Sequence, residues 1–470
     1  MDKRSNNLMK NTAILTFGNL CTKGIMFIMT PLFTRWLSQA DYGTFDLLVT
    51  YLSLIVPTIT IDIKEAVFRF LLGEEHKNEE KAVVTTGIVA NTVSFIVCIV
   101  VSLVLFIFTK GQKYIILFYA LMIISEAMYE FWVMIARGLR KITVFAIGNI
   151  IYILAMAISS LLFVKVFQGG LYGLMCSYVA GYLVSVIYMG IACKTHQYID
   201  FKSASKSMYV SMCKYAVHML PNAIAWWIIN VSDRTLVTIV LGAEANAILS
   251  VTNKLPNLCH QIFSKFHLSW QETAIDSVNS GDRDKYYSNV MNNLFKVMIS
   301  ITIGIISLNF VYFKYLFTEE YFYGYYLCPV LMVSILIYMM TQFLGGIYIA
   351  QMQSKKNGST TVIAAIINLS IDLLLIKFIG MWAAVLSTFI AYLVLFLIRY
   401  FDITKTIKLK FRKEALLYTI IMLYFVVMCY VDIMAINILN VVLACILFVV
   451  INKSIVLKIL KGISSKLKKQ

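Results

Sequence analysis

Polar side chains recur at steps of three or four residues in four otherwise apolar segments of this sequence. Such steps place each set on one face of a helix. The sets are Thr12, Thr16, Asn19 and Lys23, with Thr30 and Thr34 further along the same face; Asp46, Thr50 and Ser53, continuing through Pro57 and Thr60 to Lys64; His218, Asn222 and Asn230, before Asp233 and Arg234; and Ser250, Lys254, Asn257, Gln261 and Lys265. A polar face cannot lie against lipid. The spacing therefore predicts four helices around a hydrated cavity that binds a polar ligand.

Two of the basic residues, Lys23 and Lys254, lie about ten or more residues from either end of their apolar segments. A charge at such a position costs at least roughly 2.5–3.5 kcal/mol on insertion scales. We therefore interpret Lys23 and Lys254 as substrate-facing, with Arg234 and Lys265 as further candidates. Lys64 lies near the end of its segment, so its ammonium group is expected to snorkel to the interface.

Carboxylates inside the apolar segments form a second group of candidates. The candidate ion-coupling residues are Asp46, Glu126, Glu130, Asp233 and Asp372. Glu126 and Glu130 share one helical face, and two roles stay open for them: counter-ion of a neighbouring base, or coupling to a cation. Glu65 and Arg69 have the i, i+4 spacing of a structural ion pair.

Signatures of catalysis and of metal binding are absent from the sequence. It contains no Walker A motif and no Ser-His-Asp arrangement. The nine cysteines fall in or beside apolar stretches without a CxxC pair or an accompanying histidine cluster. We therefore expect a protein that is not an enzyme and that uses no cofactor or metal.

The composition indicates which elements must position these residues. Charged residues make up 14 % of the 470 residues and hydrophobic residues 60 %, whereas soluble domains carry roughly 25 % charged residues. These values exclude a soluble enzyme, a secreted disulfide scaffold and a disordered chain. The apolar runs are also much longer than the strands of an outer-membrane barrel. The sequence predicts an all-α polytopic membrane protein.

Fourteen segments are long enough to span a membrane, with short loops between them. They are residues 10–37, 44–70, 83–109, 114–136, 143–167, 170–193, 209–240, 246–272, 290–317, 325–350, 359–377, 381–399, 414–431 and 434–452. With a cytoplasmic N-terminus, the inner loops and ends carry 27 lysines and arginines and the outer ones carry 5. This asymmetry predicts that both termini are cytoplasmic. It also explains the net charge of +17 through anionic lipids rather than nucleic acid.

Two segments of the chain are weakly similar to each other. Leu171–Val184 aligns with Met381–Val394, sharing the pairs Ser177/Ser387, Tyr182/Tyr392, Leu183/Leu393 and Val184/Val394. Parallel repeats of this kind are a known transporter plan. We expect two six-helix lobes, residues 1–193 and 208–402, joined by a cytoplasmic linker at 194–207. Residues 403–470 would add helices 13 and 14 and a basic cytoplasmic tail.

Short motifs along nearly the whole chain form a further pattern. They are Asn11-Thr12, Gly18-Asn19, Lys23, Pro31, Leu37, Asp41-Tyr42-Gly43, Asp46-Leu47, Glu65–Arg69, Arg137-Gly138, Asp233-Arg234, Leu241-Gly242 and Ser250–Lys254. In these motifs the sequence resembles the Wzx-type oligosaccharide flippases, a branch of the multidrug/oligosaccharidyl-lipid/polysaccharide exporter superfamily. It departs from that pattern at residues 246–249, where the family usually has small and aromatic residues.

The resemblance implies a flippase in the cytoplasmic membrane. Its cargo would be an undecaprenyl-diphosphate-linked oligosaccharide, moved from the inner to the outer leaflet by alternating access for capsule or O-antigen synthesis. The implied diphosphate ligands are Lys23, Arg234, Lys254 and Lys265, and the implied sugar ligands are Asn19, Asn222, Asn257 and Gln261. Implied partners are membrane lipids, a polysaccharide polymerase and glycosyltransferases.

Three alternatives stay open at this point. A lipid II flippase would share the fold and the cationic cavity. An ion-coupled multidrug extruder should have a cavity dominated by carboxylates, which Lys23 and Lys254 disfavour. A scaffold that only organises glycosyltransferases would not need those lysines. The sequence does not name the sugar, the type of glycan, the coupling ion or the oligomeric state.

Overall fold

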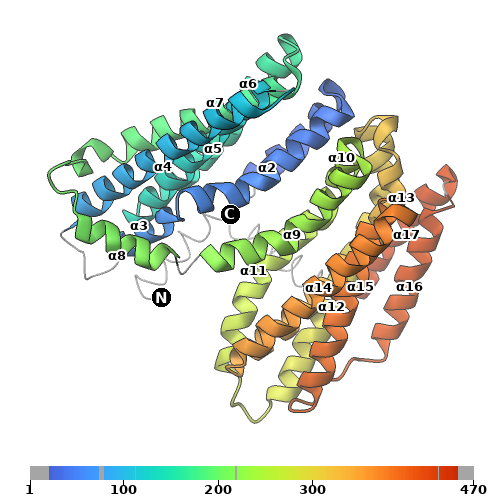
Figure 1. Ribbon diagram of the computed structural model, residues 1–470. Coiled ribbons are helices and arrows are strands. Elements are labelled where there is room, and N and C mark those ends of the chain that lie inside the picture. Colours follow the sequence, from blue (N-terminus) through green and yellow to red (C-terminus); the bar gives the residue numbers. More distant parts are fainter. Residues whose placement is uncertain (1–20, 73–78, 112, 218–219, 432, 454–470) are drawn as a thin grey trace, which may run out of the picture. The chain divides into compact units, whose positions relative to one another are not determined.

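A computed structural model describes residues 21–72, 79–111, 113–217, 220–431 and 433–453 (Figure 1). Within these ranges the chain is helical and contains no strand, so the prediction of an all-α fold is confirmed. Asn19 and the basic tail beyond residue 453 lie outside the described residues. Contacts divide the chain into two compact units, Met1–Thr235 and Leu236–Gln470.

The described part of the first unit starts with helical residues 21–36, and its last helix crosses the boundary into the second unit. Its further elements are α2 (Gln39–Ile59), α3 (Ile63–Leu72), α4 (Glu80–Phe108), α5 (Lys113–Gly138), α6 (Ile142–Ser160) with a π-helical end η2 (Leu161–Val166), α7 (Gly170–Ala192), η3 (Thr195–Tyr198), α8 (Lys206–Val217) and α9 (Leu220–Leu241).

The second unit is built in the same way from long helices. Its elements are α10 (Ala243–Thr252), α11 (Lys254–Asp276), α12 (Arg283–Val311) with a π-helical end η4 (Tyr312–Leu316), η5 (Glu319–Tyr321), α13 (Tyr323–Ala350), α14 (Ser354–Ile379), α15 (Trp382–Thr404), α16 (Glu414–Cys429) and α17 (Met434–Ile451).

Ten helices of the described residues are long and apolar enough to cross a membrane. They are α2, α4, α5, α6 with η2, α7, α12 with η4, α13, α14, α15 and α17. Large apolar side chains also stay exposed along helices such as α4, where Ile107 is 69 % and Phe108 is 79 % exposed. Lipid is the environment that such surfaces require. The chain is a multi-pass membrane protein, and the count of fourteen spans and their orientation stay predictions.

Two predicted spans are broken within the described residues, where the sequence suggested continuous helices. The second span divides into α2 and α3 around Ile61 and Asp62, which have positive φ angles of 53° and 51°. The Asp62 amide donates to the carbonyl of Pro57 at 2.8 Å, a bond typical of a helix end in the left-handed region. The eighth span divides into α10 and α11 at Asn253.

The two units share a pattern of packing that supports the predicted repeat. In the first unit α7 packs against α5 and α6, and in the second α15 packs against α13 and α14. The aligned Tyr182 and Tyr392 contact a tyrosine of the corresponding neighbour. The ring centroids of Tyr182 and Tyr129 are 5.2 Å apart, those of Tyr392 and Tyr338 are 4.8 Å apart, and both interplanar angles are 38°.

The segment predicted as an inter-lobe linker, residues 194–207, packs against α4 of the first unit. The Thr85 hydroxyl donates to the Tyr198 carbonyl at 3.2 Å and accepts from the Asp200 amide at 2.9 Å. After the linker, Met212 of α8 is fully buried in one apolar cluster with residues of α3, α4 and α5. The linker and α8 are thus anchored to the first unit, and the predicted lobe boundaries stay a prediction.

Candidate functional site

An ion pair inside the first unit joins one predicted ligand to one predicted acid. Arg234 of α9 donates from Nη1 to Oδ2 of Asp46 of α2 at 2.7 Å and to the Thr50 hydroxyl at 3.1 Å. The exposed fractions of the two charged side chains are 19 % and 10 %. Next to this pair, the hydroxyl groups of Tyr51 and Thr235 lie 3.2 Å apart. The polar faces of α2 and α9 are therefore joined by an ion pair.

A second ion pair corrects the interpretation of Lys64. Its side chain is 16 % exposed and hydrogen-bonds Glu130 of α5, with Asp62 at 3.5 Å. Snorkelling was therefore wrong for Lys64, because its charge is compensated inside the unit. Glu130 thus forms an ion pair with a base, and a role in ion coupling stays a prediction. The predicted pair of Glu65 and Arg69 is not formed, although both residues are described.

Glu126 lies one helical turn before Glu130 and faces a cluster of tyrosines. Its Oε2 atom is buried and has no hydrogen-bond partner among the described residues, and Tyr182 lies against the carboxyl group. The rings of Tyr152 and Tyr182 stack at 4.7 Å, and the Tyr129 hydroxyl donates to Oδ1 of Asn149 at 2.7 Å. Our reading of the sequence missed this cluster. Its only sequence signal is the i, i+4 spacing of Tyr178 and Tyr182.

The stripe on the first helix is divided between two environments. Lys23 is exposed, whereas Thr30 and Thr34 are 0 % and 2 % exposed. Both threonine hydroxyls donate to carbonyls of their own helix, those of Met26 and Pro31. The far end of this stripe is therefore packed inside the unit and does not line a cavity, contrary to the sequence prediction.

The predicted ligands of the second unit lie on α11. Lys254 is its first residue and is half-buried, and no ion pair of Lys254 is found among the described residues. Asn257 is exposed and Gln261 is half-buried. Lys23 and Lys254 belong to different units, so their joint action on one ligand stays a prediction.

The other predicted site residues are placed as follows. Asn222 of α9 and Lys265 of α11 are helical, and their side chains lie outside the described part of the chain. Asp233 is half-buried next to Arg234, and Asp372 of α14 is fully buried. No group of three His, Cys, Asp or Glu residues in the described ranges could hold a metal ion.

A buried arginine in the second unit was also missed. Arg399 of α15 is 1 % exposed, and no carboxylate pairs with it among the described residues. Its guanidinium donates to the Thr341 carbonyl of α13 at 2.9 Å. Its other acceptors are on α14: the Thr360 hydroxyl at 3.1 Å, the Asn357 carbonyl at 3.1 Å and the Thr361 hydroxyl at 2.9 Å. Arg399 therefore links α15 to α13 and α14 through hydrogen bonds.

A family model described as polysaccharide biosynthesis protein matches residues 8–267, more than half of the chain. The chain belongs to the polysaccharide biosynthesis protein family. The matched residues include both ion pairs of the first unit and the polar stripe of α11. Asp372 and Arg399 lie beyond the match. A sequence search of curated proteins gives no match.

Solved structures with a similar fold include a lipid II flippase and transporters of the MATE family. The lipid II flippase MurJ in an inward closed conformation has a TM-score of 0.64 and 14 % identity, covering 95 % of this chain and 100 % of that chain. An inward-facing multidrug resistance MATE family transporter of the MOP superfamily has a TM-score of 0.61 and 10 % identity, covering 83 % and 94 %. A single-residue mutant of the Vibrio cholerae MATE transporter VcmN has a TM-score of 0.56 and 11 % identity, covering 86 % and 97 %.

These likenesses show the fold of the exporter superfamily, as the sequence motifs predicted. The protein is therefore a member of the polysaccharide biosynthesis protein family with the fold that these transporters share.

The ion pair of Lys64 and Glu130 gives a first testable prediction. Lys64→Ala should lower the free energy of unfolding by about 2–3 kcal/mol, less than the 3–5 kcal/mol of a fully buried pair because Glu130 is one-third exposed. Thermal unfolding of the purified protein in detergent measures the effect. Lys81→Ala, at an exposed lysine of α4, should change it by less than about 0.5 kcal/mol. Equal losses in both variants would contradict the structural role of the pair.

Proposed function

We propose that the protein moves an undecaprenyl-diphosphate-linked oligosaccharide from the inner to the outer leaflet of the cytoplasmic membrane. The observation that carries this proposal is the polysaccharide biosynthesis match over residues 8–267, in a chain with a transporter fold. A glycan precursor made on the inner leaflet must cross the membrane before it can be polymerised outside. A transporter of this family is suited to that step.

The chain carries polar and charged residues of the kind that transport of this cargo requires. A diphosphate that carries sugars cannot enter hydrocarbon, so its carrier must offer cations and hydrogen-bond donors while the polyprenyl tail stays in lipid. Lys23 in the first unit is exposed, Lys254 in the second is half-buried, and both are cations inside predicted spans. Asn257, three residues after Lys254, is exposed on the same face of α11 and would bind sugar hydroxyls.

Arg234 takes a different part in this proposal, because Asp46 already neutralises it. A diphosphate that reaches the guanidinium would compete with Asp46 for the same donors. Since a diphosphate carries more negative charge than one carboxylate, it can displace Asp46. Asp46 would then need a proton or a metal cation, which would couple transport to an ion. Glu126, with one buried oxygen that lacks a partner among the described residues, is the second candidate for this coupling.

The second candidate function is transport of lipid II, which the similarity to MurJ favours. The MATE transporter reaches a comparable TM-score of 0.61, so the fold alone does not select a cargo. Expression of this chain in cells depleted of their own lipid II flippase separates the two candidates. Our proposal predicts no growth, and restored growth would favour lipid II.

Lys23 and Lys254 provide the variant test of the proposal. Lys23→Ala and Lys254→Ala should each stop surface glycan export and leave lipid-linked oligosaccharide on the inner leaflet, at unchanged protein level. Arginine at either position should keep part of the activity, because the charge survives although the geometry changes. Arg69→Ala, at an exposed arginine of α3, is the matched control and should export normally. Normal glycan in both alanine strains would refute the ligand assignment.

A further inference from the structure

The segment between α15 and α16 is a strongly basic stretch in the described part of the second unit, and the transport proposal does not use it. Residues 405–413 carry five cations and no acid. The five are Lys405, Lys408, Lys410, Arg412 and Lys413. All five side chains are exposed.

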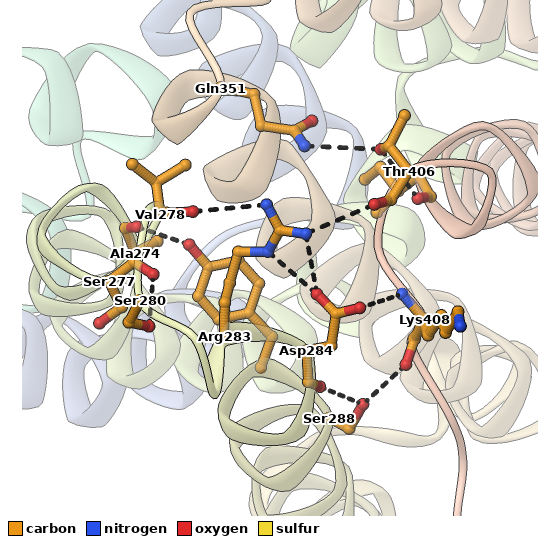
Figure 2. Close-up of polar contacts among 12 residues, drawn as sticks. Ala274, Ser277, Val278, Ser280, Arg283, Asp284, Ser288, Gln351, Thr406 and Lys408 are labelled. Carbon is orange, nitrogen blue, oxygen red and sulfur yellow. Dashed lines mark hydrogen bonds and ion pairs between the residues drawn. The ribbon is translucent and has the colours of Figure 1, made fainter.

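This basic segment is held against α12 by a regular set of hydrogen bonds. The amides of Lys408 and Lys410 donate to Asp284 at 3.0 Å and to Ser288 at 3.2 Å, and the amide of Arg412 donates to Asn292 at 2.8 Å. Figure 2 shows the start of this set, where Asp284 and Ser288 meet Lys408 and the Arg283 guanidinium bonds both Asp284 and the Thr406 carbonyl. The basic segment therefore has a fixed register on α12.

The register follows from the dimensions of helix and extended chain. Four residues of a helix advance about 6 Å, and two residues of an extended chain advance about 6.6 Å. Every second amide of the basic segment can therefore meet every fourth side chain of α12. Ile407 and Leu409 are 0 % and 4 % exposed, while Lys408 and Lys410, which alternate with them, are exposed. The exposed cations of the basic segment therefore form a row that is held in place on α12.

A small pocket of about 120 Å³ opens at the end of this row. Lys296 of α12, Arg412 and Tyr418 of α16 contribute to its lining. The Lys296 ammonium and the Tyr418 hydroxyl have no partner among the described residues, and the Arg412 guanidinium makes one side-chain bond, to Asn289 at 3.0 Å. Glu414 also lines the pocket, so its formal charge is +1. Such a pocket suits a phosphodiester monoanion.

The surroundings of the pocket indicate where this anion comes from. On α16, directly after the basic segment, Leu416, Leu417 and Ile420 are 69 %, 55 % and 56 % exposed. These side chains need hydrocarbon, whereas the cations before them need water or headgroups. The pocket therefore lies between a surface that needs hydrocarbon and a surface that needs water or headgroups. A phospholipid headgroup lies at this depth.

We propose that this pocket binds the phosphodiester headgroup of an anionic phospholipid, with its acyl chains along α16. The exposed cations at 408, 410 and 413 attract the anionic surface from a distance. With the orientation that the charge asymmetry predicts, the lipid belongs to the inner leaflet. Binding needs no cargo, so it can be tested separately from the transport proposal.

The test uses the purified full chain, stripped of lipid in a neutral detergent. Phosphatidylglycerol should raise the midpoint of thermal unfolding clearly more than phosphatidylcholine does. The double variant K296Q/R412Q should lose this difference. Native mass spectrometry provides a second readout, in which the variant should retain at least about fivefold fewer phosphatidylglycerol molecules than the unchanged protein.

The matched control is K314Q/K377Q, which removes two exposed lysines elsewhere in the same unit. This control should keep the full preference for phosphatidylglycerol. Equal effects of the two lipids on the unchanged protein would overturn the proposal. An unaltered preference in K296Q/R412Q would do the same, as would an equal loss in the control, which would indicate unspecific attraction to charge.

Discussion

Replacing Arg399 with alanine should lower the free energy of unfolding by about 3–5 kcal/mol. The guanidinium is 1 % exposed and donates four hydrogen bonds to acceptors on α13 and α14. Alanine would leave a cavity among three helices and remove all four bonds. Arg399→Lys should lose about half as much, because an ammonium group cannot reproduce the planar fork of an arginine.

Thermal unfolding in detergent and the yield of monodisperse protein measure this effect. Arg69→Ala serves as the control, since Arg69 is an exposed arginine without an ion pair in the described part of the chain. It should change the free energy of unfolding by less than about 0.5 kcal/mol. Equal midpoints for Arg399→Ala and the unchanged protein would show that the three-helix contact contributes nothing to stability.

Arg234→Ala is expected to reduce surface glycan per molecule of protein by about 10–150-fold. This range corresponds to the loss of one hydrogen bond to a charged group, worth about 1.5–3 kcal/mol. The variant also leaves Asp46 without its cation, so protein abundance should fall. Quantitative immunoblots and surface glycan staining are needed together, because export must be divided by abundance.

The double variant D46N/R234Q separates the two effects of the Arg234 change. It removes both charges, so no uncompensated carboxylate is left and abundance should recover. Export should not recover, because the proposed ligand of the diphosphate is still missing. Normal export in D46N/R234Q would mean that Arg234 serves only to neutralise Asp46.

The class of fold could be predicted because it depends on local composition, whereas the repeat stays a prediction that equivalent contacts in the two units support. The apolar runs alone indicated membrane helices, and the match of Tyr182 with Tyr392 corresponds to equivalent tyrosine contacts in the two units. Ser177 and Ser387, also aligned, are both fully buried. Similar residues at repeated positions have therefore kept similar surroundings.

The breaks within spans could not be predicted from hydropathy. The predicted second and eighth spans run straight across Asp62 and Asn253, where the structure separates two helices, because a span is recognised by its average hydropathy over about 20 residues. Pro57 and Pro256 lie close to these two points, yet prolines are tolerated in membrane helices when other groups satisfy the backbone. The position of Lys254 at the start of α11 therefore became visible only in the structure.

The partners of the buried charges were hidden for a different reason. Helical spacing shows which residues share a face of one helix, and it does not show which helix that face meets. Lys64 and Glu130 are 66 residues apart in the chain, and Arg234 and Asp46 are 188 apart. Arg399 was counted only as an inner positive charge, since neutral acceptors such as threonine hydroxyls leave no recognisable sequence signal.

The proposed function is tested most directly by measuring the leaflet in which lipid-linked oligosaccharide resides. Spheroplasts of a deletion strain, carrying either the unchanged gene or the Lys23→Ala/Lys254→Ala variant, would be treated with a lectin that binds the glycan and cannot cross the membrane. The proposed function predicts that the lectin reaches the lipid-linked pool with the unchanged gene and fails to reach it with the variant or the empty vector. Equal access in all three strains would contradict the proposal that this protein is the flippase.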